Sequence, residues 1–465
     1  MKTVIPKEEF EKVTRWDKEY CETFAKTFSK AQATIPHYGH VDGYKVAEGK
    51  KGEWAARLLV ASALKPRFIT PAMEAHMKMR VNVFLRVLPR LHELLRTSRD
   101  AQKYFHLSKA EAELVRHGPV YDHVVPVGRF DGVVDPQNGL RVYELNLNCP
   151  AGGGWGDFVY DIIRRFPAFK EFKKKYTLRL HLNWQKPMLE TLLKNYRAWG
   201  GKETHPKILI LRWKGQYNQD SDFFAQEFQK LGYHAASGDA TQVHYDGKSL
   251  RYHGTAYDLV LRWFDLDHVY EVKEKYRDIM RAYFDNAVCI VNPFVSSVMA
   301  HKAFFAFFTD ERFSDHITKE EREALGNMCP WTRILEDRRT IGMDGKEYDL
   351  LKYAAEQKNR LVIKRSISTY GKDIFIGTEM TGAAWGRHIK KTVREGGWIA
   401  QERVTLERGY EPMVKNGRVG KELMYRDMDP YVFDGMYNKS IGRFSPNLVT
   451  NGIQGGAVQI VGTVT

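Results

Sequence analysis

The sequence has few cysteines and no long apolar run. Only four of its 465 residues are cysteines, and none stands in a CxxC or CxxH pair: Cys21, Cys149, Cys289 and Cys329. This spacing argues against a zinc site or a disulfide framework, so we expect reduced thiols. No stretch approaches the roughly 20 apolar residues that span a bilayer, and the first residues lack the apolar run of a secretion signal. We therefore expect a cytoplasmic protein with no membrane partner.

Two familiar phosphate-binding patterns are also missing. No GxxxxGK[ST] loop occurs, and the glycine-rich stretch at 152–156 lacks the strand and helix that flank a dinucleotide fingerprint. Repetitive stretches and stretches rich in Pro, Ser or Gly are absent as well. With 43% hydrophobic residues, the chain can form several packed lobes of roughly 100–200 residues each.

Positive charge is what the chain has in excess. The formal net charge is +15, and a basic surface concentrates anions around it. Nucleic acid is one candidate partner, but the basic residues are spread along the chain, as at 170–175 and 387–391, and are interleaved with acids rather than gathered into a tail. No recognisable RNA or DNA module is present. Solvated helix faces explain most of this charge. The remaining basic residues are candidates for binding ATP phosphates and an acidic substrate.

The spacing of apolar residues predicts a mixed α/β (α+β) protein. Helical spacing holds from the start to about residue 120, and a hairpin follows, with strands at 124–134 and 140–147 around a turn at 136–139. A strand at 208–211, a helix at 222–231 and a strand at 259–263 have the rhythm of an α/β lobe. Segments 361–364, 374–376 and 398–400 are predicted strands of one antiparallel sheet.

Lys364 follows the apolar residues of one predicted strand and precedes a loop rich in hydroxyl groups. A lysine on a rigid strand can place a charge against phosphates, while Ser368, Thr369 and Gly371 offer hydroxyl and backbone donors. About forty residues later, an apolar strand turns polar at Gln401 and Glu402, where it could contact an adenine edge. A strand lysine before a loop, or a strand with a polar end, is by itself more often structural than functional. The prediction of a nucleotide site therefore rests on the two features occurring together.

The hairpin carries acidic and amide side chains on one face. Glu144 and Asn146 are two residues apart on a strand and therefore point the same way, and Asp131 lies on the partner strand. Oxygen ligands of this kind, together with substrate phosphates, suit Mg²⁺. Arg129 is placed to neutralise a transferring phosphoryl group. A solvated hairpin face with turn-capping residues is an equally simple interpretation of this pattern, and the glycines near 435 and 452–456 fit either a ligand contact or hairpin turns.

Taken together, these features resemble the ATP-grasp superfamily, in particular its circularly permuted branch of glutathionylspermidine-synthetase-like and glutathione-synthetase-like ligases. The resemblance covers roughly residues 120–460 and rests on motifs in a fixed order. Besides the Arg-x-Asp and Glu-x-Asn hairpin, these are Val291-Asn292-Pro293, His301-Lys302, Pro330-Trp331-Thr332-Arg333, Val362-Ile363-Lys364 and Gln401-Glu402-Arg403-Val404. One departure is Ser368-Thr369-Tyr370, which stands where the family carries further glycines and predicts a stiffer loop.

The resemblance implies four regions: a helical N-terminal region (1–120), the metal-binding half of the ATP-grasp domain with connecting helices (121–205), a Rossmann-like pre-ATP-grasp domain (206–295) and the ATP-binding half (296–465). It implies an ADP-forming ligase that joins a small-molecule carboxylate to an amine through an acylphosphate, with ATP and Mg²⁺ as cofactors. In the roles that follow, Lys302 and Lys364 bind phosphates, Arg129 stabilises phosphoryl transfer, Gln401, Glu402 and Val404 bind adenine, and Asp131, Glu144 and Asn146 hold magnesium.

Two alternatives stay open. An ATP-binding module without catalysis is compatible with the altered loop, although a full set of metal ligands speaks for an enzyme. A basic protein that associates with nucleic acid is the less favoured alternative, and the sequence indicates nothing about oligomeric state.

Overall fold

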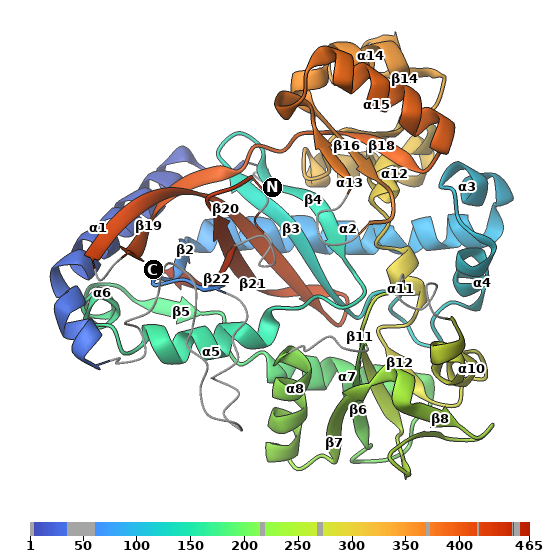
Figure 1. Cartoon of the computed structure of the whole chain (residues 1–465), viewed down its shortest axis with the longest axis horizontal. Helices are drawn as coiled ribbons and strands as arrows, with labels where there is room; N and C mark the ends of the chain where they lie inside the picture. Colours follow the sequence, from blue (N-terminus) through green and yellow to red (C-terminus); the bar gives the residue numbers. More distant parts are fainter. Residues whose placement is uncertain are drawn as a thin grey trace.

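The computed structural model describes residues 4–34, 61–213, 219–266, 273–368, 373–415, 418–448, 450 and 456–465. A large central sheet lies between two smaller lobes, which are at the top and bottom of Figure 1. We call residues 331–402 the upper lobe and residues 206–291 the lower lobe. No helix among the described residues is long and apolar enough to cross a membrane.

The central sheet has nine strands drawn from both ends of the chain. Its main order is β1-β22-β21-β20-β3-β4, with β19 beside β20 and with β2 and β5 beside β22. The bounds are β1 Ala61–Ser62, β2 Arg67–Ile69, β3 Val127–Asp135, β4 Gly139–Asn146, β5 Leu178–Leu180, β19 Glu407–Lys415, β20 Arg418–Phe433, β21 Met436–Ser445 and β22 Ala457–Val464. The predicted hairpin is confirmed as the antiparallel pair β3–β4.

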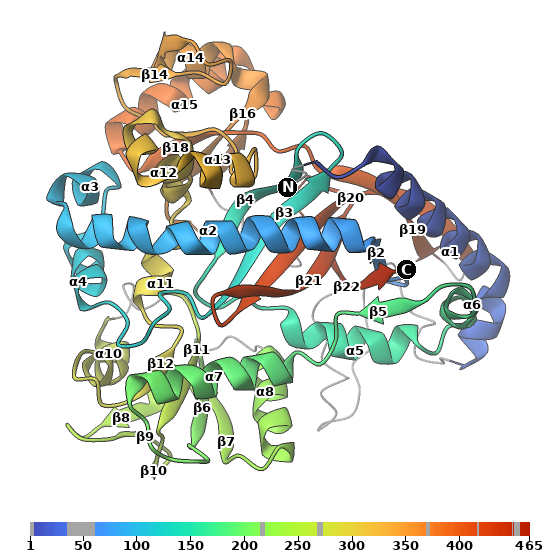
Figure 2. The same cartoon turned by 180° about the vertical axis from the view of Figure 1, so that it is seen from behind.

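The N-terminal region is mostly helical, as predicted. It contains α1 Lys7–Thr34, α2 Pro71–Thr97, α3 Arg99–Tyr104 and α4 Lys109–His117. Thr70 caps α2 by accepting a hydrogen bond from the Met73 amide at 3.3 Å. Helix α2 then runs across the sheet past β4, β3 and β21 (Figure 2). Sequence spacing did not reveal β1 and β2, which pair with the far C-terminal strand β22.

One face of the sheet packs on α2, and this fixes which side chains face away from it. The Phe130 ring of β3 meets the Phe84 ring of α2 edge-on, with centroids 5.2 Å apart. Because side chains alternate along a strand, Arg129 and Asp131 point to the opposite face. The candidate site residues Arg129 and Asp131 therefore face away from α2.

The lower lobe has the predicted strand–helix–strand core. Its parallel sheet runs in the order β12-β11-β6-β7, with small strands β8–β10 beside it. The bounds are β6 Ile208–Arg212, β7 Ala235–Asp239, β8 Val243–Tyr245, β9 Leu250–Tyr252, β10 Thr255–Ala256, β11 Leu259–Trp263, β12 Cys289–Val291, α7 Gln185–Trp199, α8 Gln219–Lys230 and α10 Arg277–Phe284. Helices α5 Gly153–Ile163 and α6 Pro167–Lys175 connect this lobe to the hairpin.

The upper lobe contains the predicted antiparallel sheet, in the order β13-β18-β16-β17. Its elements are β13 Thr332–Ile334, β14 Arg339–Ile341, β15 Glu347–Asp349, α14 Leu350–Glu356, β16 Leu361–Arg365, β17 Ile374–Ile376, α15 Gly382–Glu395 and β18 Trp398–Glu402. Short helices α11 Val295–Val298, α12 Phe305–Thr309 and α13 Lys319–Leu325 lead into it. A small core of its own includes Trp331, Trp385 and Trp398.

Candidate active site

Two lysines meet at the base of the upper lobe. Lys364, at the end of β16, donates hydrogen bonds to Gln401 Oε1 at 2.8 Å and to the Tyr143 carbonyl at 3.2 Å. Lys302 Nζ lies 3.0 Å from Glu144 Oε1 and donates to the Ser368 carbonyl at 2.6 Å. Both lysines are buried. The hairpin of the central sheet and the upper lobe are thus joined through these two amines.

Burial changes the acidity of Lys364. Desolvation lowers its pKa to about 8, and neighbouring Lys302 acts in the same direction, while Glu144 opposes the shift. An incoming phosphate would favour the charged amine. The site therefore contains a cation whose charge responds to its ligand.

A cavity of about 130 Å³, which we call the first cavity, lies between the hairpin and the upper lobe. Its apolar wall includes Val362, Ile374, Ile376, Leu406 and Leu448. Its lining also contains six residues that the sequence predicted: Asp131, Glu144, Lys364, Gln401, Glu402 and Val404. An apolar slot with a few polar groups at its ends suits a planar ring carrying charged substituents.

The predicted adenine-contacting residues have different environments. Gln401 is buried, and its amide is fully engaged, because Oε1 accepts from Lys364 and Nε2 donates to Thr332 Oγ1 at 3.1 Å. Glu402 forms an ion pair with Arg141 at 2.6 Å, and Val404 lines the cavity. The Gln401 side chain therefore positions Lys364, which leaves Glu402 and the backbone near Val404 to contact a base.

The hairpin brings its predicted residues together. Arg129 pairs across the strands with Asn146, and Asp131 pairs with Glu144. Asp131 accepts from Arg129 Nε at 2.6 Å and from Asn146 Nδ2 at 2.9 Å. Burial works to raise the pKa of Asp131, but Arg129 and Arg443 together hold it below its usual value. Asp131 is therefore an ionised carboxylate in a cationic setting.

A β-bulge at Asp131 and Gly132 shapes this end of the hairpin. A Cβ atom on Gly132 would lie 2.4 Å from the Arg141 carbonyl oxygen, which is closer than real contacts allow. Only glycine fits there, so the close approach of the two backbones depends on it.

Sequence analysis missed an acidic pair that completes the cluster. Arg443 of β21 lies within 2.7 Å of both Asp131 and Asp427 and within 2.8 Å of Asp429. Both new carboxylates are fully buried on β20, and Tyr143 donates to Asp427 at 3.2 Å. Burial raises the pKa of Asp429 against the influence of Arg443. The sequence Asp427-Met428-Asp429 could have indicated this pair, because residues two apart on a strand point to the same face of the sheet.

No protein-family model matches the sequence, and no curated protein matches it either. Among solved structures, a glutathione-synthetase-like effector from Globodera pallida, in its apo form, aligns with a TM-score of 0.56 over 94% of this chain and 96% of that one, at 11% identity. The chain has the ATP-grasp fold. At this identity the likeness shows the fold alone, and circular permutation stays a prediction.

Two further alignments are weaker. D-alanyl-alanine synthetase A from Vibrio cholerae O1 aligns over 56% of this chain and 74% of its own at 10% identity, with a TM-score of 0.30. The ATP-grasp ligase PsnB, complexed with a minimal precursor, aligns over 55% and 94% at 11% identity, with a TM-score of 0.25. Neither alignment supports the fold assignment, which depends on the alignment with the Globodera pallida protein alone.

Within this ATP-grasp fold, the loop after β16 is only partly described. Ser368 contributes its carbonyl to Lys302, whereas Thr369 and Gly371 lie outside the described residues. The Asp434-Gly435 pair is placed in the turn between β20 and β21, with φ values of 52° and 67°, and belongs to a hairpin turn rather than to the site. The four cysteines are free thiols, as predicted.

The predicted magnesium ligands fit the hard-oxygen preference of that ion. Asp131, Glu144 and Asn146 supply two carboxylates and an amide oxygen, and Mg²⁺ usually needs one or two carboxylates besides phosphates and water. Asp131 is already bound by two guanidinium groups, whereas the Glu144 carboxylate contacts Lys302 and is about a third exposed. Among the described residues no three His, Cys, Asp or Glu side chains form a preformed metal cluster. Glu144 is accordingly the ligand best placed to receive an ion together with phosphates.

Proposed function

We propose that this protein is an ATP-dependent, Mg²⁺-dependent carboxylate–amine ligase of the ADP-forming kind. The observation that carries the proposal is the convergence of Lys364, Glu144 and Asp131 at a cavity between the central sheet and the upper lobe, with Lys302 paired to Glu144 beside it. The ATP-grasp fold supports it, because that fold places nucleotide between two such sheets in the family that the sequence resembles.

The side chains suggest a division of labour. The apolar wall of the first cavity receives the adenine ring, with Glu402 at its edge. The phosphates meet the amine of Lys364, which lines the cavity, and that of Lys302, which lies beside Glu144. At about 130 Å³ this cavity is smaller than the about 300–1,000 Å³ of typical small-molecule sites. Nucleotide binding therefore requires the upper lobe to move outward.

The chemistry follows from charge. Arg129 Nη1 donates to the Ala151 carbonyl at 2.6 Å, which holds its guanidinium at the open end of the hairpin. There it can stabilise negative charge while the γ-phosphoryl group moves to a substrate carboxylate. The resulting acylphosphate is attacked at carbon by an amine, which loses a proton as phosphate leaves and an amide bond forms. Mg²⁺, when bound, neutralises phosphate charge.

Release of ADP and phosphate tests the proposal. ATP, Mg²⁺ and pooled amino acids, small peptides and polyamines are incubated with the protein and with Lys364→Met. Release that requires a component of the pool and is lost in the variant supports the ligase. Tight ATP binding with no release from any pool would favour a non-catalytic module, and failure to bind ATP would overturn the nucleotide site.

A further inference from the structure

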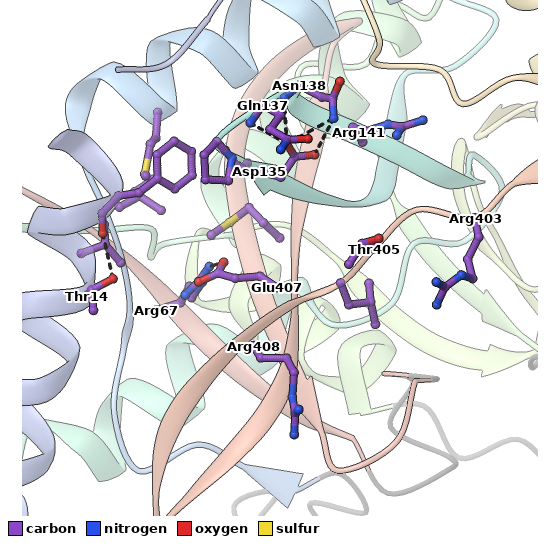
Figure 3. A pocket seen from close by; sticks show the side chains of 18 of the residues that line it. Thr14, Arg67, Asp135, Gln137, Asn138, Arg141, Arg403, Thr405, Glu407 and Arg408 are labelled. Atoms are coloured by element: carbon purple, nitrogen blue, oxygen red, sulfur yellow. Dashed lines mark hydrogen bonds and ion pairs between the residues drawn. The ribbon is translucent and has the colours of Figure 1, made fainter. Parts of the chain in front are cut away.

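A second cavity, of about 760 Å³, lies on the other side of the segment that joins the upper lobe to the central sheet. We call this segment, residues 401–408, the hinge segment. Figure 3 shows the cavity enclosed by α1 with Thr14, by β2 with Arg67, by the β3–β4 turn around Asp135, and by the hinge segment from Arg403 to Arg408. Its volume falls within the about 300–1,000 Å³ of small-molecule sites.

One wall of this second cavity is apolar. Side chains from α1, β2, α2, the hairpin and β20 contribute to it: Phe10, Val13, Phe68, Met73, Val134 and Met428. A ligand that fills the cavity would therefore bury a hydrocarbon or aromatic body against this wall.

The rest of the lining is rich in arginine. Five arginines face three carboxylates there: Arg67, Arg141, Arg360, Arg403 and Arg408 against Asp135, Glu402 and Glu407. The excess of positive groups indicates an anionic ligand, because clefts lined by one sign of charge concentrate the opposite sign.

The carboxylates are committed to other partners. Glu407 pairs with Arg67, and Glu402 pairs with Arg141. Asp135 Oδ1 accepts the amides of Gln137 and Asn138 at 2.8 and 2.7 Å and so stabilises its own turn.

Three of the five arginines have no carboxylate partner among the described residues: Arg360, Arg403 and Arg408, of which Arg408 donates to the Leu423 carbonyl at 3.5 Å. Among the described residues, neither the Arg360 nor the Arg403 side chain forms an ion pair or a side-chain hydrogen bond. Their backbones are joined, since the Arg403 amide donates to the Arg360 carbonyl at 2.8 Å. The two residues therefore occupy adjacent backbone positions in the cavity wall, and the charge of neither guanidinium group is neutralised by a protein carboxylate among the described residues.

We propose that the second cavity binds a small organic carboxylate with an apolar body, its carboxylate between Arg360 and Arg403 and its body against Phe10 and Met428. Guanidinium groups suit carboxylates because their planar donors can pair with both oxygens. This ligand is distinct from the acid that a ligase would activate, because neither Lys364 nor Arg129 lines this cavity.

The position of Glu402 connects this ligand to the nucleotide. Glu402 lines both cavities, and its partner Arg141 lines the second. Arg403 also lines both cavities, so a carboxylate bound to Arg403 changes the charge next to Glu402 and next to a base. This coupling rests on the proposed nucleotide site, whereas binding of the carboxylate itself does not.

Isothermal titration of the full chain without nucleotide tests the binding site. The probe is 4-phenylbutyrate, compared with the uncharged 4-phenylbutanol and with inorganic phosphate. We expect saturable binding of 4-phenylbutyrate alone. In the double variant Arg360→Gln/Arg403→Gln, its Kd should rise at least about tenfold, because the two unpaired cations are lost. Phe10→Ala should also weaken binding, through the apolar wall.

The matched control is Arg387→Gln/Arg394→Gln, which removes the same charge from the exposed face of α15 and should leave the Kd unchanged. Circular dichroism melts confirm that each variant is folded. Equal binding of phosphate would overturn the proposed ligand class, and so would equal binding of the alcohol. A Kd that is unaffected by the double substitution, or the absence of any binding, would overturn the site.

Nucleotide titrations separate this inference from the proposed function. If ATP binds, saturating 4-phenylbutyrate should change the Kd for ATP several-fold in the wild type and not in the double variant. Failure of ATP to bind would remove the ligase proposal while the carboxylate titration still decides the second cavity. An unchanged Kd for ATP would overturn the coupling through Glu402.

Discussion

The two cavities on either side of the hinge segment differ in how their charges are balanced. At the first, buried cations meet acceptors within the protein: Lys302 meets Glu144, and Arg443 meets three aspartates. In the second, Arg360 and Arg403 have no acidic partner among the described residues. Internal pairing keeps the buried charges at the first cavity stable without a ligand, whereas the unpaired guanidinium groups at the second cavity are available to bind an anion. Substitutions on the two sides should therefore affect different properties.

The largest expected effect is on stability, at Arg443. Arg443→Met leaves the buried carboxylates of Asp131, Asp427 and Asp429 without their shared cation, and we expect the free energy of unfolding to fall by about 3–5 kcal/mol. Arg403→Met, on the other side of the hinge segment, should change it by no more than about 0.5 kcal/mol. Urea unfolding followed by circular dichroism measures both. Equal stability of the two variants would show that the aspartates do not depend on Arg443.

Loss of Lys364 should remove turnover rather than folding. Replacing this lysine by Met removes the cation that the proposed function places against the transferring phosphoryl group, and the rate of ADP release should fall by about 10²–10³-fold. The control is Lys352→Met on α14, whose side chain is 76% exposed and does not line the cavity. Turnover within threefold of wild type in Lys364→Met would exclude Lys364 from the chemistry.

Glu144→Gln should weaken the dependence on magnesium without abolishing ATP binding. The variant keeps the shape of the side chain but loses its charge, so half-maximal ADP release should require about tenfold more Mg²⁺ or above. Glu356→Gln on α14 serves as the control for charge. A superimposable Mg²⁺ titration in Glu144→Gln would place the metal elsewhere than the hairpin.

The smallest expected effect is a pH dependence that distinguishes the cavities. With the pKa of Lys364 lowered to about 8, its amine is charged below that pH and neutral above it, so affinity for ATP should fall several-fold between pH 7 and pH 9. Lys364→Arg should flatten this profile, because a guanidinium keeps its charge. Binding of 4-phenylbutyrate, which depends on arginine, should stay constant over the same range. If the affinities for ATP and for 4-phenylbutyrate changed in the same way with pH, the two cavities would not differ in the acidity of their cations.

Local patterns in the sequence predicted much of the fold. The β3–β4 hairpin, the three upper-lobe strands and the alternating strands of the lower lobe all follow from spacing within about ten residues. They could be predicted because each segment packs against neighbours in the chain, and its apolar period reflects that packing.

The rest of the site depends on contacts between distant segments. Asp427 and Asp429 look like ordinary exposed residues of a strand until β20 pairs with β3, which places them beside Asp131. The second cavity combines α1 with the hinge segment, almost 400 residues later. No single segment of the sequence contains either arrangement, so spacing alone could not predict it.

The pairing of β1 and β2 with β22 also has a consequence for how the chain folds. Arg67 is aligned with Val461, and Ala61 with Ala457, so these contacts close loops of almost the whole chain. Closure of so long a loop is entropically costly and slow, while the upper and lower lobes need only local contacts. We expect both lobes to form early during synthesis and the central sheet to form last. Until that step, the strands on which both cavities depend have exposed edges and are open to association with other chains.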